Sequence, residues 1–253
     1  MSGVRMNHPE GKRLLANIRG GDFAHAGEEA AVHIAWKSLP KRKDQHCLDA
    51  GCGRGGTAAL VQRSGWGLVT GLDIDRETIS FACETYADVR FIAADITRAG
   101  ELFPGHFDVV YAFNAFYAFP DQAVALNSLR QATRPDALLC LFDYVDRGGF
   151  CETAFAKKSE TRLWRPMKLE SLPADLEAAG WRLKECLEIH SEYREWYADL
   201  VQRFARRRQD LLGLFAPDLV AYAEDYYQAM LRSIEEGALG GAIVYAQRSN
   251  TSA

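Results

Sequence analysis

The sequence has little that would support a disulfide framework or a bound metal. Its six cysteines, at positions 47, 52, 83, 140, 151 and 186, form no Cys-x-x-Cys pair. Such pairs are the signature of structural zinc sites and of many redox sites. Most of the six lie within apolar runs, which predicts small buried side chains, and no metal is expected.

The chain also lacks an excess of positive charge and any long apolar run. Its 30 lysines and arginines are outnumbered by 34 aspartates and glutamates, giving a net charge of −4. A nucleic acid or an anionic membrane surface normally requires a basic patch, so neither is expected as a partner. No stretch has the length of a signal peptide's apolar region or of a membrane span. These absences favour a cytoplasmic protein that acts on a small molecule.

What the sequence does have is a regular alternation of short apolar runs and helical segments from residue 46 onward. This order is typical of a doubly wound α/β fold with a parallel sheet. The runs are almost continuous in Val, Ile, Leu and Phe, as expected for strands covered on both faces. The predicted strands are 46–50, 67–74, 89–95, 107–113 and 137–145, with helices at 57–64, 76–86 and 121–134.

The second half of the chain departs from this alternation. Residues 181–190 alternate like a strand, two long helical patterns follow within about 192–237, and residues 240–249 form a last strand. A closing, hairpin-like pair of strands of this kind would place an antiparallel strand on an otherwise parallel sheet. We therefore predict a Rossmann-like, mostly parallel seven-stranded sheet whose last strand is antiparallel. A helical segment over 1–45 precedes this core, which spans 46–253 and carries a helical cap.

The most informative stretch is CLDAGCGRGGTAAL, where Gly51, Gly53 and Gly56 form a G-x-G-x-x-G pattern. Glycines between a strand and a helix let backbone amides approach a ligand closely, and in dinucleotide sites that ligand is a pyrophosphate. Here Asp49 precedes the first glycine by two residues. A carboxylate at that point repels a pyrophosphate and favours a ligand with positive charge or hydrogen-bond donors. Cys52 lies inside the loop and is therefore expected near the ligand.

With this carboxylate, the run LDAGCGRG resembles the glycine loop of the class I S-adenosylmethionine-dependent methyltransferases. The cofactor S-adenosylmethionine carries an ammonium and a sulfonium and no phosphate. Asp73, at the tip of the second strand, is placed to accept hydrogen bonds from a ribose, beside Ile74. The resemblance implies that Asp95 accepts from the adenine amino group and that Ile96 lines the ring. It also implies that the loop after the fourth strand, which includes Asn114, holds the methionine end and the substrate.

The stretch RGGDFAHAGEEAA at 19–31 resembles a segment of small-molecule methyltransferases of the sarcosine/dimethylglycine and phosphoethanolamine type. In that group the segment closes over the carboxylate end of the cofactor, so residues 1–45 are expected to cover the cofactor. The resemblance makes Phe23, His25 and Gly27 candidates for cofactor contact. A capped, solvent-facing histidine explains His25 equally well.

Methyl transfer from a sulfonium is an in-line displacement, so the protein mainly aligns the reacting atoms and excludes water. A general base is needed only when the nucleophile arrives protonated. Several members of the resembling family carry an acid and a histidine after the fourth strand, where this sequence has Asn114 and Ala118. The remaining candidates for proton handling are His25, Tyr117 and Tyr144.

Aromatic side chains are numerous where the fold places loops and the helical cap over the strand ends. They fit a pocket for a flat ring or a cationic amine, or they belong to the core, as the helical spacing at 193–197 favours. Segment 146–169 has no clear periodicity and fits either a lid or an ordinary surface loop. The aromatic residues in question are Phe113, Phe116, Tyr117, Phe119, Trp164, Tyr193, Trp196 and Tyr197.

The sequence therefore predicts a methyltransferase that uses S-adenosylmethionine and acts on a small metabolite or natural product, with a nitrogen acceptor slightly favoured. An NAD(P)-dependent oxidoreductase is the alternative, supported by the glycine pattern and Asp73. Against it, the region after the fifth strand has no convincing Tyr-x-x-x-Lys pair, and the chain has no second catalytic domain. A non-catalytic protein that binds the cofactor is a third hypothesis, because the usual histidine is missing.

Overall fold

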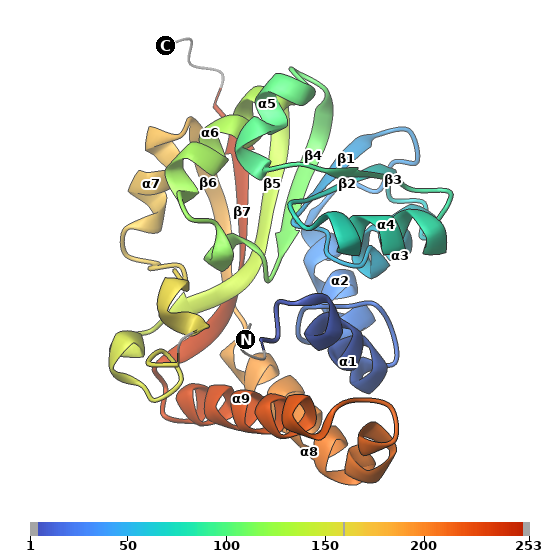
Figure 1. Ribbon diagram of the computed structural model, residues 1–253. Helices are drawn as coiled ribbons and strands as arrows, with labels where there is room; N and C mark the ends of the chain where they lie inside the picture. Colours follow the sequence, from blue (N-terminus) through green and yellow to red (C-terminus); the bar gives the residue numbers. More distant parts are fainter. Residues whose placement is uncertain (1–4, 159, 250–253) are drawn as a thin grey trace.

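The strands assemble into one sheet in the computed structural model, which describes residues 5–158 and 160–249. Over these residues the sheet has seven strands in the order β3-β2-β1-β4-β5-β7-β6 (Figure 1). They are β1 (His46–Ala50), β2 (Leu68–Asp73), β3 (Arg90–Ala93), β4 (Phe107–Phe113), β5 (Thr133–Asp146), β6 (Trp181–Glu188) and β7 (Leu239–Arg248).

The first five strands form the parallel part of the sheet. β1 pairs with β2 and with β4, β3 extends the sheet beyond β2, and β5 extends it beyond β4. β7 runs antiparallel between β5 and β6. The predicted mostly parallel sheet with an antiparallel last strand is therefore confirmed. The strand order reverses between β1 and β4, and this is the point where doubly wound sheets bind their ligands.

Helices cover both faces of the sheet, so each face has its own hydrophobic core. One core includes residues of α2, α3, α4, α8 and α9, and the other includes residues of α5, α6 and α7. Burial on both sides explains why the strands are almost continuously apolar. The helices are α1 (Pro9–Arg19), α2 (Glu28–Ala35), α3 (Gly56–Arg63), α4 (Arg76–Thr85), α5 (Ala99–Leu102), α6 (Gln122–Ala132), α7 (Leu172–Ala178), α8 (His190–Leu212) and α9 (Pro217–Glu235).

The two longest helices, α8 and α9, pack against each other beyond the end of the sheet, next to α1 (Figure 1). Both also contact β7. The predicted helical cap at about 192–237 coincides in sequence with these helices, and its role as a separate unit stays a prediction. No helix in the described part of the chain is long and apolar enough to cross a membrane.

Three local features differ from the prediction. α6 ends at Ala132, because Thr133 already pairs with Phe107 as the first residue of β5. The sequence pattern does not predict α5, whose four residues are too few to show a helical period. Only half of the cysteines are buried, since those at 83, 151 and 186 are exposed.

Trp181 provides a test of the packing between the edge strand β6 and α6. Its side chain is fully buried, and its Nε1–H donates to the carbonyl of Leu126 over 3.0 Å. Trp181→Ala is expected to lower the free energy of unfolding by about 3–5 kcal/mol, because it leaves a cavity and an unpaired carbonyl. Urea denaturation measures the change, with Leu187→Ala on the same strand as the exposed control, expected within about 0.5 kcal/mol of the unaltered chain. Equal effects of the two substitutions would contradict this packing.

Candidate functional site

The glycine loop lies between β1 and α3 and is held close to the end of β2. The backbone N–H groups of Gly51 and Cys52 both donate to the carbonyl of Leu72, over 2.8 and 3.0 Å. The N–H of Gly53 donates to Oδ2 of Asp73 over 2.9 Å. Hydrogen bonds to a carboxylate are the stronger kind, so Asp73 fixes the loop at the point where β2 ends.

Two of the glycines are required by close approaches of other segments. Gly51 has a φ of +83°, and a Cβ atom there would lie 2.5 Å from the Cβ of Ala115. A Cβ at Gly56 would lie 2.6 Å from the carbonyl oxygen of Asp22. The loop therefore packs against the segment after β4 and against the N-terminal segment, and a side chain at either position would force them apart.

A cavity of about 390 Å³ lies where the strands end, and its size suits a small-molecule ligand. Its walls come from the strand ends, the N-terminal segment, Trp164 and α9. Three predicted site residues, His25, Asp49 and Cys52, are buried and do not belong to the lining. The predicted site residues that do line the cavity are Phe23, Gly51, Gly53, Asp73, Ile74, Asp95, Ile96, Asn114, Tyr117 and Tyr144.

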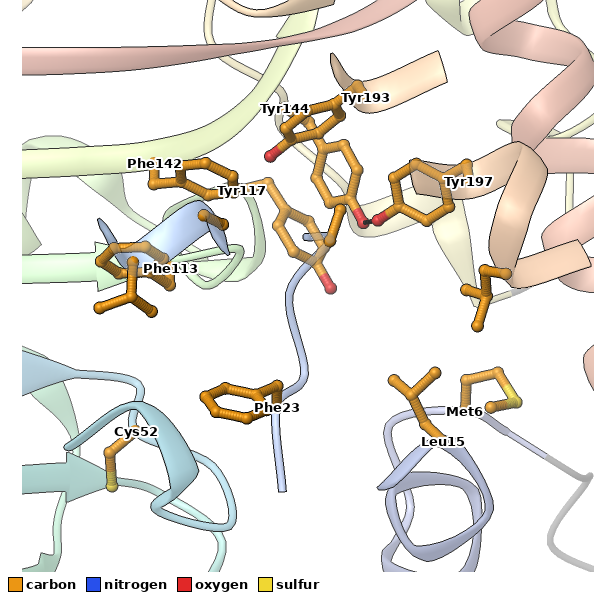
Figure 2. Close-up of a cluster of buried hydrophobic side chains, with 14 of the residues drawn as sticks. Met6, Leu15, Phe23, Cys52, Phe113, Tyr117, Phe142, Tyr144, Tyr193 and Tyr197 are labelled. Atoms are coloured by element: carbon orange, nitrogen blue, oxygen red, sulfur yellow. Dashed lines mark hydrogen bonds between the residues drawn. The ribbon is translucent and has the colours of Figure 1, made fainter. Parts of the chain in front are cut away.

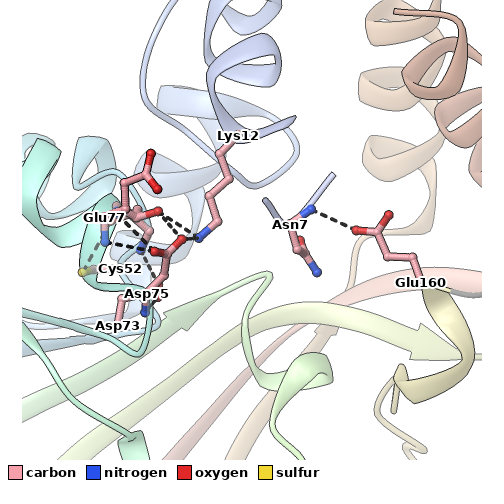
Figure 3. A network of polar contacts seen from close by, with 9 residues as sticks. Asn7, Lys12, Cys52, Asp73, Asp75, Glu77 and Glu160 are labelled. Atoms are coloured by element: carbon pink, nitrogen blue, oxygen red, sulfur yellow. Dashed lines mark hydrogen bonds and ion pairs between the residues drawn. The ribbon is translucent and has the colours of Figure 1, made fainter. Parts of the chain in front are cut away.

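Both cations in the cavity lining are already paired with carboxylates of the same lining. Nζ of Lys12 lies 2.9 Å from Oδ2 of Asp75, and Figure 3 draws this ion pair as a dashed line. Nε of Arg54 lies 2.6 Å from Oδ1 of Asp22, whose Oδ2 accepts from the hydroxyl of Tyr86 over 2.8 Å. These pairs fasten the N-terminal segment to the glycine loop and to α4. They also leave neither cation free to receive a phosphate.

Two further carboxylates make the end of the cavity beside β1, β2 and β3 acidic. Asp73 accepts from the backbone N–H groups of Gly53 and Asp75, the latter over 3.0 Å. Asp95 accepts from the backbone N–H and the hydroxyl of Thr97, over 2.9 and 2.8 Å. With the two ion pairs, this end has four carboxylates and two cations. This excess of negative charge repels negatively charged groups of a ligand and attracts positively charged ones.

Asp49 lies behind the glycine loop and not in the cavity wall. Its side chain is 1% exposed, and burial raises its pKa to about 8. Burial therefore favours the neutral carboxyl group, in contrast to the charged group that the sequence pattern suggests. Its Oδ2 atom has no hydrogen-bond partner in residues 5–158 and 160–249. The repulsion of phosphate thus comes from the acidic lining, and contact between Asp49 and a cofactor stays a prediction.

Cys52 is also buried, and its thiol is not part of the cavity lining. Burial raises the pKa of this thiol well above its usual range. A thiol that stays protonated is a poor nucleophile, so the position does not favour a reactive role.

His25 is 1% exposed, so the solvent-facing alternative is wrong. Nδ1 lies 3.1 Å from the carbonyl oxygen of Ala26, and Nε2 lies 2.9 Å from Oγ1 of Thr57. Because a carbonyl only accepts, Nδ1 carries the proton and Nε2 accepts from the Thr57 hydroxyl. Burial lowers the pKa of His25 to about 3. The ring is neutral with both nitrogens engaged, an arrangement that does not favour proton handling in the cavity.

Segment 146–169 contributes to the cavity wall through Trp164 and is tied to the N-terminal segment through Glu160. The Glu160 carboxylate accepts from the backbone N–H groups of Met6 and Asn7, over 3.0 and 2.9 Å, and Figure 3 shows the contact with Asn7. It also accepts from the hydroxyl of Tyr222 on α9 over 2.9 Å. The segment therefore connects the N-terminal segment to α9 through Glu160. Its movement as a lid stays a prediction.

The opposite end of the cavity, beside β4, β5 and α9, is aromatic. The ring of Tyr117 lies 4.0 Å from the ring of Trp164 and 5.0 Å from that of Tyr144, measured between centroids. The hydroxyls of Tyr144 and Tyr197 share a hydrogen bond. Figure 2 shows Phe23 between the glycine loop at Cys52 and the tyrosine rings.

The aromatic residues divide between the cavity and the core. Helical spacing indicates the core for Tyr193, Trp196 and Tyr197, and these residues do not line the cavity. The same spacing does not identify Tyr226 and Tyr227 of α9, which do line the cavity, because the helix face that carries them contacts both the core and the cavity. The aromatic residues in the lining are Phe23, Phe113, Tyr117, Phe119, Tyr144, Trp164, Tyr226 and Tyr227.

A buried acid that the sequence analysis missed holds the turn after β4. Asp143 is fully buried on β5, and its Oδ2 accepts from the backbone N–H groups of Ala115, Phe116 and Tyr117, over 2.7 to 3.2 Å. Burial raises its pKa to about 7, although these hydrogen bonds favour the carboxylate. Asp143 therefore positions the part of the lining that carries Tyr117. The available signal was an acid inside the otherwise apolar run LCLFDYV.

Residues 48–141 match a family model described as a methyltransferase domain. The chain is similar to an O-methyltransferase from Pyrenophora dematioidea, with 29% identity over 159 residues, which cover 59% of this chain and 59% of that protein. It is also similar to phosphoethanolamine N-methyltransferase 1 from Zea mays, with 24% identity over 206 residues, which cover 79% of this chain and 41% of that protein.

Among solved structures, the chain resembles phosphoethanolamine N-methyltransferase 2 from Haemonchus contortus in complex with phosphomonomethylethanolamine and S-adenosylhomocysteine. The TM-score is 0.85 at 19% identity, over 95% of this chain and 58% of that chain. The likeness establishes a shared fold. The expected resemblance to methyltransferases of the phosphoethanolamine type is confirmed, and this chain spans less than two thirds of each of the three proteins.

The buried histidine predicts a pH dependence of stability. The folded-state pKa of His25 is lowered from 6.5 to about 3, so the unfolded chain takes up this proton first as the pH falls. Stability is therefore present above about pH 6.5 and is lost toward pH 3, by at most about 1.4 kcal/mol per pH unit from this group. His25→Asn should be less stable at pH 7 and lose less stability on acidification. Thermal unfolding from pH 7.5 to 4.5 measures this, with the exposed His33→Asn as control, and parallel profiles for all three chains would refute it.

Proposed function

Because the chain carries a methyltransferase domain in the fold of the class I methyltransferases, we propose that it transfers a methyl group from S-adenosylmethionine to a small-molecule acceptor. The acidic end of the cavity is the observation that carries this proposal. Its lining offers carboxylates beside a glycine loop, and both of its cations are already paired. A cationic ligand without phosphates fits these charges, whereas a dinucleotide would bring two negative charges to them.

The residues present at this end fit S-adenosylmethionine, which when bound supplies a methyl group on a positively charged sulfur. Asp73 and Asp95 line the cavity with carboxylates that are able to accept from ribose hydroxyls and an adenine amino group. Ile74 is 71% exposed and lines the cavity together with Ile96, so both apolar side chains are available to pack on a flat base.

The chain's own residues act mainly by positioning and by excluding water. Phe23 and the N-terminal segment cover the cavity, and Asp143 fixes the turn that carries Tyr117. Among the described residues the lining contains no histidine, and its carboxylates lie at the acidic end. This favours an acceptor whose attacking atom has a free lone pair, such as a neutral nitrogen, over one that must first lose a proton. Proton handling by Tyr117 or Tyr144 remains part of the proposal, since both line the cavity.

The partner and the location follow the same reasoning. The net charge of −4 supports a small-molecule acceptor in preference to a nucleic acid. We place the reaction in the cytoplasm as part of this proposal.

Calorimetric titration with S-adenosylmethionine, S-adenosylhomocysteine and NAD⁺ tests the cofactor. We expect saturable binding of the first two and none of NAD⁺. Asp73→Asn should weaken binding of S-adenosylhomocysteine about 10- to 100-fold, because a charged hydrogen bond is worth about 1.5–3 kcal/mol. Asp88→Asn is the control, since it removes the same charge from an exposed position away from the cavity and should leave the affinity unchanged. Binding of NAD⁺ alone would overturn the proposal.

A further inference from the structure

The charged side chains of the cavity are confined to one of its ends. All of them come from the N-terminal segment or from the ends of β1, β2 and β3 and the residues that follow. The lining residues from β4, β5 and α9, together with Tyr117 and Trp164, form the aromatic chamber. In the described part of the chain this chamber contains no Asp, Glu, Lys, Arg or His. Its residues are Phe113, Tyr117, Tyr144, Trp164, Tyr226, Tyr227 and Met230.

Three charged groups that act on the tyrosines of the aromatic chamber are used elsewhere. Asp143 is occupied by backbone N–H groups, and Glu160 is occupied by two backbone N–H groups and a tyrosine hydroxyl. The buried Arg19 is paired with Glu28 over 2.7 Å. None of the three belongs to the cavity lining. An anionic group of an acceptor would therefore lose its hydration in the chamber without gaining an opposite charge, which is strongly unfavourable, and the negative faces of the rings would repel it.

The aromatic chamber does offer ring surfaces. The rings of Tyr144 and Trp164 lie 4.8 Å apart, and the rings of Tyr226 and Trp164 lie 6.5 Å apart. Walls of this kind suit flat rings through stacked and edge contacts.

We propose that the aromatic chamber selects an acceptor that has no anionic group at neutral pH and carries an aromatic or heteroaromatic ring. This inference rests on the proposed function and specifies its acceptor. It separates this chain from the Haemonchus contortus enzyme, whose bound phosphomonomethylethanolamine carries both a phosphate and an amine. An acceptor of that kind requires charges of both signs, and the chamber supplies neither.

The test measures acceptor binding by calorimetry with the chain saturated by S-adenosylhomocysteine. The probes are 2-naphthol, 2-naphthoate, 2-naphthyl phosphate and phosphoethanolamine, which vary charge with and without the ring. We expect 2-naphthol to bind at least tenfold more tightly than either naphthyl anion, and phosphoethanolamine not to bind. Binding of phosphoethanolamine or of an anion as tight as that of 2-naphthol would overturn the inference, as would failure of 2-naphthol to bind.

A pair of neighbouring substitutions checks that the ring is bound in the chamber. Trp164→Leu should weaken 2-naphthol binding at least tenfold and leave the affinity for S-adenosylhomocysteine unchanged. Leu163→Ala, at a side chain that is 78% exposed, is the matched control and should change neither. Unchanged 2-naphthol binding by Trp164→Leu would place the ring elsewhere and contradict the inference. If the unaltered chain did not bind S-adenosylhomocysteine, that result would instead contradict the proposed function. Failure of the inference and failure of the proposed function are therefore distinguishable.

Discussion

The carboxylate of Asp73 joins the parts of the molecule on which the site depends. It ends β2, accepts from Gly53 in the glycine loop, and accepts from the N–H of Asp75 at the start of α4. Lys12 of the N-terminal segment then pairs with Asp75. Strand, loop, helix and N-terminal segment thus meet at one acidic point, and the charge of that point decides which ligands the loop can take.

The two ends of the cavity suit ligand groups of different charge and polarity. Its acidic end suits a nucleoside with positive charge, and its aromatic end has no charged side chain among the described lining residues. Asp143 holds the turn after β4 through a hydrogen bond from the backbone N–H of Tyr117, and this turn brings Tyr117 to the aromatic end. The order of the strands sets the two ends apart, because β2 and β3 lie on one side of β1 and β4 and β5 lie on the other.

The sequence predicts the fold well, because strands covered on both faces appear as continuous apolar runs. It also predicts lining residues that follow directly from a strand end, such as Asp73 and Asp95. It does not show which of these side chains tertiary packing buries: Asp49 and His25 have the expected residue types but lie outside the cavity lining. Contacts between distant residues are equally hidden, since Lys12 and Asp75 are 63 positions apart. The two cavity tyrosines of α9 share a helix face with the core, and periodicity does not distinguish these roles.

The most direct test is a crystal structure of the chain grown with S-adenosylhomocysteine. The account predicts ribose hydroxyls hydrogen-bonded to the carboxylate of Asp73, with the adenine between Ile74 and Ile96 and its amino group at Asp95. A nucleoside bound away from these residues would contradict the central claim that the acidic end of the cavity selects the cofactor.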